Sequence, residues 1–218
     1  MAILNYQPPL DPYLDIVYRD DHIVMVNKPS GLLTVPGKAL EHKDCLETRV
    51  ATVLPDARVV HRLDMATSGI LILALSRKAH AEIGKQFQAR TTKKQYIANV
   101  YGLVKEDYGT IELPLICDWP NRPKQMVDMV NGKHSLTHYE VLERFDNHTR
   151  VLLKPVTGRS HQLRVHMLSI GHPILGDRLY ANPEALAMAD RLHLHAEWIS
   201  FLHPHNRKRM KFTAECPF

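Results

Sequence analysis

Cysteine is scarce in this chain of 218 residues. Cys45, Cys117 and Cys216 are far apart in the sequence, and no two cysteines have the CxxC spacing. A disulfide framework and a thiolate zinc site are therefore not expected. A few reduced cysteines are typical of a cytosolic protein, so we expect the chain to be cytoplasmic.

Long apolar runs and a strong net charge are also absent. The longest apolar run, Ile70 to Leu75, is far too short to cross a bilayer, and the N-terminus lacks the regions of a signal peptide. The formal charge is +5, with a pI of about 9.1. This excess permits an anionic partner such as nucleic acid without requiring one. Hydrophobic residues make up 44% of the chain, which is ordinary for a globular protein.

Patterns for nucleotide cofactors and metals are incomplete. Neither GxxxxGK[ST] nor GxGxxG occurs, so no nucleotide cofactor is expected. His193 with His195, and His203 with His205, could each lie on one side of a strand, but no third ligand has a convincing spacing. His195-Ala196-Glu197 matches one half of the zinc nucleobase deaminase signature, while the second half, PCxxC, is missing.

Hydrophobic periodicity predicts an α+β fold with a mixed, mostly antiparallel sheet. Ile70 to Leu75 reads as a strand buried on both faces, and Ser76 can cap a helix running to about Arg90. Further helices are expected over 46–54, with a capping box from Asp44 to Glu47, and from the Ser160 cap through Leu168. Leu113 to Lys124 is predicted to be an ordered loop. The remaining strands are expected at 16–27 (two strands around a turn), 94–102, 137–145, 150–156, 197–203 and 208–213.

An acidic residue, Asp64, comes directly before the buried strand. In an extended chain Arg62 and Asp64 point to the same side, because side chains of a strand alternate. A cation and a carboxylate would then share one surface. A salt bridge at the strand entrance explains this pair as well as a catalytic role does, so the stretch alone leaves both open.

The stretch from Thr157 to His166 joins a glycine-containing turn to the start of a helix. Free backbone N–H groups at a helix N-terminus favour anions, and Arg159 adds positive charge there. His161 and Arg164 are three residues apart and would share one helix face. A solvated basic face is the simpler explanation of this stretch on its own.

Basic residues stand beside an aromatic ring in Lys93-Lys94-Gln95-Tyr96. In strand geometry Lys94 and Tyr96 face the same way, which suits phosphate contact together with base stacking. A tyrosine on a half-buried strand is commonplace, and the charged run from Arg207 to Lys211 is typical of a solvated surface. Neither stretch decides the function alone.

Together these stretches resemble the RluA family of pseudouridine synthases. The central match is His61-Arg62-Leu63-Asp64-Met65-Ala66-Thr67-Ser68-Gly69, and the resemblance extends over nearly the whole chain. Several such motifs in the family's order are a stronger signal than any one of them. The other matching stretches are Asp20-Asp21-His22-Ile23, Asn27-Lys28-Pro29-Ser30-Gly31, Lys94-Gln95-Tyr96-Ile97-Ala98, Gly158-Arg159-Ser160-His161-Gln162-Leu163-Arg164-Val165-His166 and Gly171-His172-Pro173-Ile174-Leu175-Gly176-Asp177.

The resemblance implies the catalytic fold of that family, in which helices and loops flank the sheet around a central cleft. Larger relatives carry an N-terminal S4 RNA-binding domain. Because the match already begins at Asp20, we expect no S4 domain here. The expected division is an N-terminal arm over residues 1–15 and one catalytic domain over residues 16–218.

The resemblance also implies roles for individual residues. Asp64 resembles the aspartate that attacks the target uridine, and Arg164 resembles the arginine that pairs with it. Tyr96 resembles the ring that stacks on the uracil and can serve in proton removal. We therefore assign Asp64, Tyr96 and Arg164 to catalysis. Arg62 resembles the residue that fills the space left by the flipped nucleotide, Leu163 resembles a pocket wall, and the RNA-binding set is His61, Arg62, Lys94, Arg159, His161 and Leu163.

The implied reaction moves the bond of ribose C1′ from N1 to C5 of uracil. It involves no net redox change and no ATP, so no cofactor and no metal are expected. Leu113 to Lys124 resembles the dual-specificity branch of the family, which implies target uridines in a loop of 23S rRNA and in the anticodon stem-loop of some tRNAs. We expect a monomer with RNA as its partner and no membrane. A non-catalytic RNA-binding module and a zinc nucleobase deaminase are the alternatives.

Overall fold

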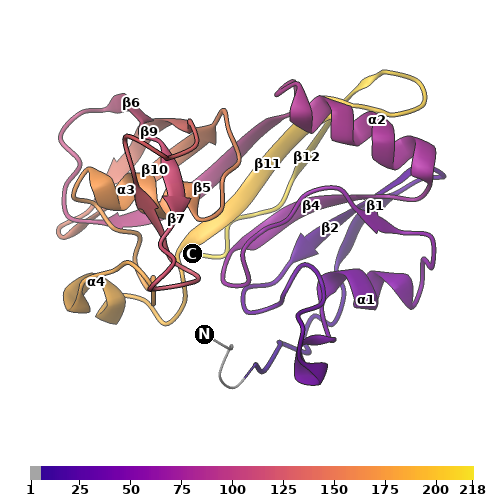
Figure 1. Cartoon of the computed structure of the whole chain (residues 1–218), viewed down its shortest axis with the longest axis horizontal. Helices are drawn as coiled ribbons and strands as arrows, with labels where there is room; N and C mark the ends of the chain where they lie inside the picture. Colours follow the sequence, from indigo (N-terminus) through magenta and orange to yellow (C-terminus); the bar gives the residue numbers. More distant parts are fainter. Residues whose placement is uncertain (1–5) are drawn as a thin grey trace. The chain divides into compact units, whose positions relative to one another are not determined.

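The structure is a computed structural model that describes residues 6–218. The chain forms two compact units (Figure 1). One contains Gln95–His195 with Phe218, and we call it the central unit because it is the middle of the sequence. The other, the flanking unit, contains the described residues up to Lys94 together with residues 196–217. None of the helices in the described part of the chain has the length and apolar character needed to span a membrane.

The flanking unit is built on a sheet in the order β1, β2, β4, β11, with β12 paired to β11 and β3 paired to β4. The pairs β1–β2, β2–β4, β3–β4 and β11–β12 are antiparallel. The two predicted strands around Asp20-Asp21, the buried strand and the final hairpin are confirmed. The strands are β1 (Ile16–Arg19), β2 (Ile23–Lys28), β3 (Arg58–Val59), β4 (Ser68–Ala74), β11 (Leu194–Leu202) and β12 (Arg209–Thr213).

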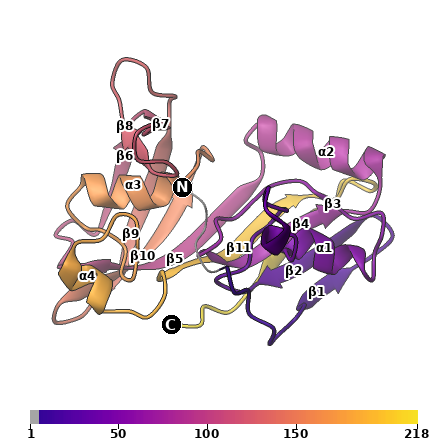
Figure 2. The same ribbon diagram turned by 60° about the horizontal axis from the view of Figure 1, so that its bottom comes forward.

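Helices lie on both sides of this sheet (Figure 1, Figure 2). Helix α2 (Arg77–Gln88) begins at Ser76, whose hydroxyl oxygen accepts the N–H of Ala79 at 3.1 Å, as the sequence predicts. Helix α1 (Leu46–Ala51) lies on the opposite side. Every residue of β4 is buried, so its two faces contribute to two layers of core. The layer beneath α2 contains Ile23, Met25, Ile70, Ile72, Ile83, Ile199 and Phe201.

Gly69 fixes the close approach of β4 to its neighbour. Its φ is +119°, and a Cβ atom built there would lie 2.3 Å from the carbonyl oxygen of Ala196. Only glycine fits such a conformation and such a contact without moving the backbone. The small residue at this position therefore places the end of the loop that contains Asp64 directly against β11.

The start of α1 differs from the prediction. Cys45, not Asp44, is the N-cap, and Thr48 completes the capping box. Asp44 does not cap the helix, because its two carboxylate oxygens accept 2.7 Å hydrogen bonds from Arg49. This charge-assisted pair lowers the pKa of Asp44. The helix also ends at Ala51, before the predicted end at residue 54.

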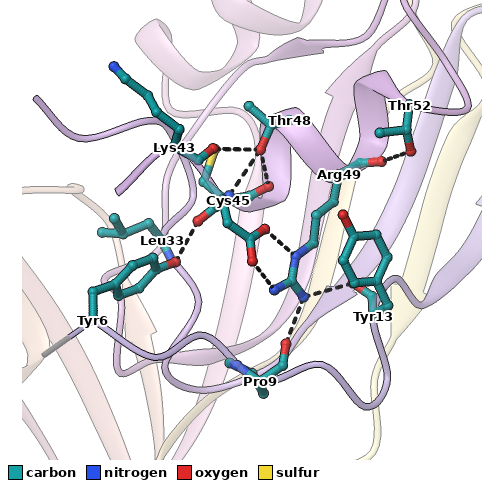
Figure 3. Close-up of polar contacts among 10 residues, drawn as sticks. Tyr6, Pro9, Tyr13, Leu33, Lys43, Cys45, Thr48, Arg49 and Thr52 are labelled. Atoms are coloured by element: carbon teal, nitrogen blue, oxygen red, sulfur yellow. Dashed lines mark hydrogen bonds and ion pairs between the residues drawn. The ribbon is translucent and has the colours of Figure 1, made fainter. Parts of the chain in front are cut away.

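Arg49 joins the segment after residue 5 to the flanking unit (Figure 3). Its side chain is fully buried and donates to the carbonyl oxygens of Pro9 and Tyr13 at 2.8 and 2.9 Å. The guanidinium also lies 4.4 Å from the centre of the Tyr13 ring. Tyr6 adds a hydrogen bond from its hydroxyl to the carbonyl of Asp44 at 2.8 Å. The described part of the expected N-terminal arm is thus held by specific contacts, while residues 1–5 lie outside the described residues.

The central unit contains an antiparallel sheet in the order β5, β10, β9, β6. The predicted strand from Lys94 and the predicted hairpin around Asp146-Asn147 are confirmed. Helix α3 lies beside the short β7–β8 hairpin (Figure 2). The elements are β5 (Lys93–Tyr101), β6 (Tyr108–Glu112), β7 (Leu115–Cys117), β8 (Gln125–Val127), β9 (Leu136–Arg144), β10 (His148–Pro155), α3 (Gln162–Ser169) and α4 (Pro183–Ala187).

The prediction of a loop from Leu113 to Lys124 is wrong in part. This stretch contains β7, which pairs with β8 immediately after it. Three prolines, at 114, 120 and 123, obscured these short strands, since proline cannot donate to a strand ladder. They stand before β7 and in the turn rather than at its paired positions. The α+β class with a mixed sheet and few helices is confirmed.

Candidate active site

Asp64 lies in a loop of the flanking unit between β3 and β4. The backbone N–H of Thr67 donates to the carbonyl oxygen of Asp64 at 3.1 Å and closes a turn. Asp64 is half-buried and Arg62 is exposed. Because neither residue belongs to a strand, the argument that strand alternation places them on one side was wrong. A tight turn ahead of a fully buried strand is what positions this carboxylate.

A buried lysine fixes the backbone on the C-terminal side of Asp64. Lys28 is 0% exposed, and its ammonium donates to the carbonyl oxygens of Leu32 at 2.7 Å, Pro29 at 2.9 Å and Met65 at 3.1 Å. A buried ammonium is tolerated only when its donors are satisfied. Lys28 therefore ties the loop after β2 to the residue that follows Asp64.

The hydroxyl groups of Thr34 and Ser30 fix the residues on either side of Asp64. Thr34 donates to the carbonyl oxygen of Leu63 at 2.7 Å and accepts the N–H of the same residue at 3.2 Å. Ser30 donates to the carbonyl oxygen of Ala66 at 2.7 Å. The peptide groups on both sides of Asp64 are thus held by neighbouring side chains. Such preorganisation is what a reacting carboxylate requires.

His61, Phe87 and Lys94 form a cluster in the flanking unit. The ring of His61 stacks on Phe87 with 4.6 Å between ring centres, and the Lys94 ammonium lies 6.0 Å from the same phenyl ring. His61 Nε2 accepts the N–H of Ile72 at 3.3 Å. Burial, together with the positive charge of Lys94, lowers the pKa of His61 to about 3. His61 is therefore neutral at physiological pH, and RNA contact by His61 stays a prediction.

In the central unit, the predicted catalytic arginine has a buried carboxylate partner. Arg164 Nε and Nη2 donate to the two carboxylate oxygens of Asp177 at 2.7 and 2.6 Å. Both side chains are almost fully buried, at 5% and 0% exposure. Asp177 also accepts the backbone N–H of Leu179 at 2.9 Å. The guanidinium plane is thereby fixed, and pairing of Arg164 with Asp64 stays a prediction.

Tyr180 connects three parts of the central unit. Its hydroxyl oxygen accepts the N–H of Gln125 at 2.8 Å and lies 2.6 Å from His161 Nδ1. Its ring centre is 5.0 Å from the guanidinium carbon of Arg164. One phenol thus joins the β7–β8 hairpin, the start of α3 and the arginine.

His161, not Ser160, is the N-cap of α3, which corrects the predicted helix start. Its φ of 53° is unusual for a residue with a side chain and stores strain. The amide of Gln162 explains the displacement, because its oxygen accepts from Thr157 Oγ1 at 2.7 Å and from the N–H of Arg159 at 3.0 Å. The turn is therefore closed by a side chain of the helix itself.

The remaining predicted site residues are also placed. Tyr96, in β5, is 9% exposed and pairs with Leu153 of β10. Leu163, in α3, is 7% exposed. Arg159 is exposed, and its Nε donates to the carbonyl oxygen of His134 at 3.2 Å.

The structure therefore places the predicted residues in two sets. His61, Arg62, Asp64 and Lys94 belong to the flanking unit, whereas Tyr96, Arg159, His161, Leu163 and Arg164 belong to the central unit. The roles assigned to both sets stay predictions. Within residues 6–218, no group of three or more His, Cys, Asp or Glu side chains is arranged to hold a metal ion.

Three positioning residues were missed from the sequence: Lys28, Asp177 and Tyr180. A lysine at the end of an otherwise apolar strand was a usable signal for Lys28, because a cation there needs buried partners. Asp177 stood in a stretch that carried the family resemblance. No local pattern indicated Tyr180, whose side chain contacts Arg164 and Gln125, 16 and 55 positions away.

Comparison with known proteins decides between the candidate functions. The family model described as RNA pseudouridylate synthase matches residues 22–169. The chain belongs to this family. It is 57% identical over 219 residues to the dual-specificity RNA pseudouridine synthase RluA of Escherichia coli K12, with both chains covered completely. The protein of that name from Haemophilus influenzae is 52% identical over 219 residues, again with full coverage of both.

Solved structures agree with the family. The human RNA pseudouridylate synthase domain containing 1 aligns with a TM-score of 0.79 and 31% identity, covering 94% of this chain and 84% of that one. The human domain containing 4 shares the fold, with a TM-score of 0.75, 23% identity, and coverage of 93% and 88%. The chain is thus an RNA-modifying isomerase that converts uridine to pseudouridine. Neither the non-catalytic RNA-binding module nor the zinc deaminase is supported.

Proposed function

We propose that this synthase modifies uridines in two kinds of stem-loop, one in 23S rRNA and one in the anticodon arm of some tRNAs. The observation that carries this proposal is the full-length similarity to relatives named as dual-specificity enzymes, at 57% identity. The similarity covers both chains completely, so it includes every loop of this chain. We also propose that the protein acts as a monomer in the cytoplasm, where both RNAs are present.

In the proposed mechanism, the carboxylate of Asp64 attacks the target nucleotide. The carboxylate bonds to C1′ as the bond between C1′ and N1 breaks, and the base then turns. C5 displaces the carboxylate from C1′, after which the C5 proton leaves to a base and N1 takes up a proton. This is covalent catalysis of the kind that glycosidases use, and it needs no redox partner because the reaction is an isomerisation. Hydrogen bonds from Lys28 and Thr34 hold the backbone on both sides of Asp64. They support this role, because the carboxylate must hold one position throughout the reaction.

We propose that Arg164, while bound to Asp177, is also the arginine that pairs with the carboxylate of Asp64, as the family resemblance implies. The Asp177 carboxylate fixes the plane of the Arg164 guanidinium, because it accepts hydrogen bonds from two of its nitrogens. The fixed orientation of the guanidinium supports this assignment.

Arg62 and Tyr96 would compensate for extrusion of the base. Unstacking a nucleotide costs roughly a few kcal/mol. Arg62 is exposed on the loop that carries Asp64, which suits insertion into the vacated space. Tyr96 stacking on the uracil would contribute about 1–3 kcal/mol.

The targets are tested by mapping pseudouridines in total RNA from a strain that lacks this gene. The proposal expects two classes of site to disappear, in 23S rRNA and in tRNA, and both to return when the wild-type gene is restored. Loss of sites from only one RNA class would contradict dual specificity.

The proposed oligomeric state and location are tested separately. Size-exclusion chromatography with light scattering tests whether the protein is a monomer, and fractionation of cells tests whether it is in the cytoplasm.

A further inference from the structure

The turn of the β7–β8 hairpin carries an exposed aromatic ring that the proposed reaction does not use. Trp119 is 64% exposed. A large exposed apolar side chain indicates a binding site when it belongs to a contact surface, because exposing apolar area to water is unfavourable. The guanidinium of Arg122 lies 4.6 Å from the centre of the Trp119 ring. An aromatic ring paired with an arginine is typical of surfaces that stack on nucleic-acid bases.

The turn that carries Trp119 is ordered by its own hydrogen bonds. The backbone N–H of Asp118 donates to the carbonyl of Lys124 at 3.0 Å, and the N–H of Asn121 donates to the carbonyl of Asp118 at 3.1 Å. The side chain of Asn121 also donates to the Asp118 carboxylate at 2.9 Å. The ring is therefore presented on a preorganised support, which reduces the entropy lost on binding.

The charges of the hairpin favour RNA as the occupant. Arg122, Lys124 and Lys133 are basic, and Lys133 is exposed. The acidic groups are engaged in forming turns: Asp118 with Asn121 as above, and Asp128 as the acceptor of two backbone N–H groups at 2.8 Å. The negative charge of Asp118 beside the ring makes base stacking, rather than phosphate binding, the main contribution.

The hairpin is continuous with residues assigned to RNA binding. Gln125 of β8 donates to Tyr180, whose hydroxyl contacts His161. Arg159 donates to the carbonyl of His134, just beyond the hairpin. Contacts within the central unit therefore connect the hairpin to His161 through Tyr180, and connect Arg159 to the segment that follows the hairpin.

We propose that Trp119 and Arg122 form a second RNA-binding platform, which stacks on an unpaired base of the substrate stem-loop other than the target uridine. The inference rests on the proposed stem-loop substrates. It assigns to the hairpin a share in the affinity for RNA, while the bond chemistry is assigned to Asp64. Binding and conversion can therefore be tested separately.

Intrinsic fluorescence gives a direct test of stacking. The chain has two tryptophans, so Trp198→Phe leaves Trp119 as the single reporter. Titration of this variant with an anticodon stem-loop RNA is expected to quench its emission in a saturable way. Trp119→Phe, which retains Trp198, is the matched variant and should show little quenching. Because this experiment measures binding, failure of the catalytic role of Asp64 would not alter its outcome.

Affinity and kinetics give the second test. Trp119→Ala is expected to raise the Kd for the stem-loop between about 5-fold and about 100-fold, the range of a single base–aromatic stack. Trp119→Phe should retain most of the affinity because it keeps a ring. The control is Tyr108→Ala, which removes a 79% exposed ring from β6 of the same unit and should change Kd less than twofold.

Two results would overturn the platform. One is an unchanged Kd in Trp119→Ala with an unchanged melting temperature, as expected if the turn instead serves a protein partner. The other is an equal loss of affinity in Trp119→Ala and Tyr108→Ala, which would mean that the ring has no specific place in the complex.

Discussion

Arg164 and Asp177 form a bidentate ion pair that is buried in the central unit, with donor–acceptor distances of 2.7 and 2.6 Å. The pair fixes the plane of the guanidinium that the proposed mechanism needs for Asp64. It also makes Arg164 sensitive to a residue that need not touch the RNA.

Asp177→Asn is therefore expected to impair both folding and catalysis. Removing one charge from a buried pair leaves the other uncompensated, at a cost of about 3–5 kcal/mol in the free energy of unfolding. Urea denaturation measures this loss. Turnover of the folded fraction should fall mainly in kcat, because in the proposed mechanism Arg164 acts on the carboxylate of Asp64. A stable, fully active Asp177→Asn variant would contradict the positioning role.

Tyr180→Phe tests the contacts that the Tyr180 hydroxyl makes with the start of α3 and with β8. The substitution keeps the ring beside Arg164 but removes the hydroxyl that contacts Gln125 and His161. Losing these hydrogen bonds should reduce the free energy of unfolding by about 1–3 kcal/mol, since the N–H of Gln125 loses its acceptor. KM for the stem-loop should rise more than kcat falls, because the phenol connects elements that are predicted to bind RNA. Thermal melting and steady-state kinetics together separate this outcome from simple destabilisation.

Arg49→Lys tests the attachment of the N-terminal segment. Lysine keeps the charge but not the planar fork that bonds Asp44, Pro9 and Tyr13 together. A destabilisation of about 2–4 kcal/mol is expected in urea, because buried acceptors lose their partners. Lys85→Ala is the control, since the exposed Lys85–Glu82 pair should contribute little to the free energy of unfolding. Equal effects of the two substitutions would contradict the assignment.

The pKa of His61 predicts a loss of stability in acid. It is about 3 in the folded protein, against an ordinary value of 6.5. Between these values the unfolded state binds more protons, so the free energy of unfolding falls as pH decreases. The contribution of His61 is at most about 1.4 kcal/mol per pH unit.

His61→Gln keeps a hydrogen-bond acceptor and removes the titration, so its stability should depend less steeply on pH. Urea titrations at several pH values below 6.5 measure the two slopes. Burial also lowers the pKa of His166 and of His193, the latter to about 4, so both proteins retain some slope and the difference is the test. Parallel slopes would contradict a His61 that is neutral in the folded protein.

Much of the fold was predictable because its signals are local. The apolar run of β4 and the Ser76 cap of α2 follow from periodicity and from capping chemistry. The starts of α1 and α3 were misplaced because distant or unusual partners decide them. Asp44 binds Arg49 instead of capping, and Gln162 closes its own turn so that His161 becomes the N-cap.

The candidate site was predictable only where a motif carries it. Asp64 and Arg164 stood in stretches that resemble a known family, and the sequence placed them in order. The contacts that fix them come from residues far along the chain: Lys28 bonds the carbonyl of Met65, 37 positions away. No pattern within a short window contains such information, because folding and not sequence proximity brings the partners together.

The central claim is that the carboxylate of Asp64 performs the bond chemistry. The most direct measurement is pseudouridine formation by Asp64→Asn on a stem-loop RNA, with RNA binding measured in parallel. The substitution removes a charge but little volume, so we predict binding within a few-fold of wild type and no detectable pseudouridine. Wild-type conversion by Asp64→Asn would contradict the account.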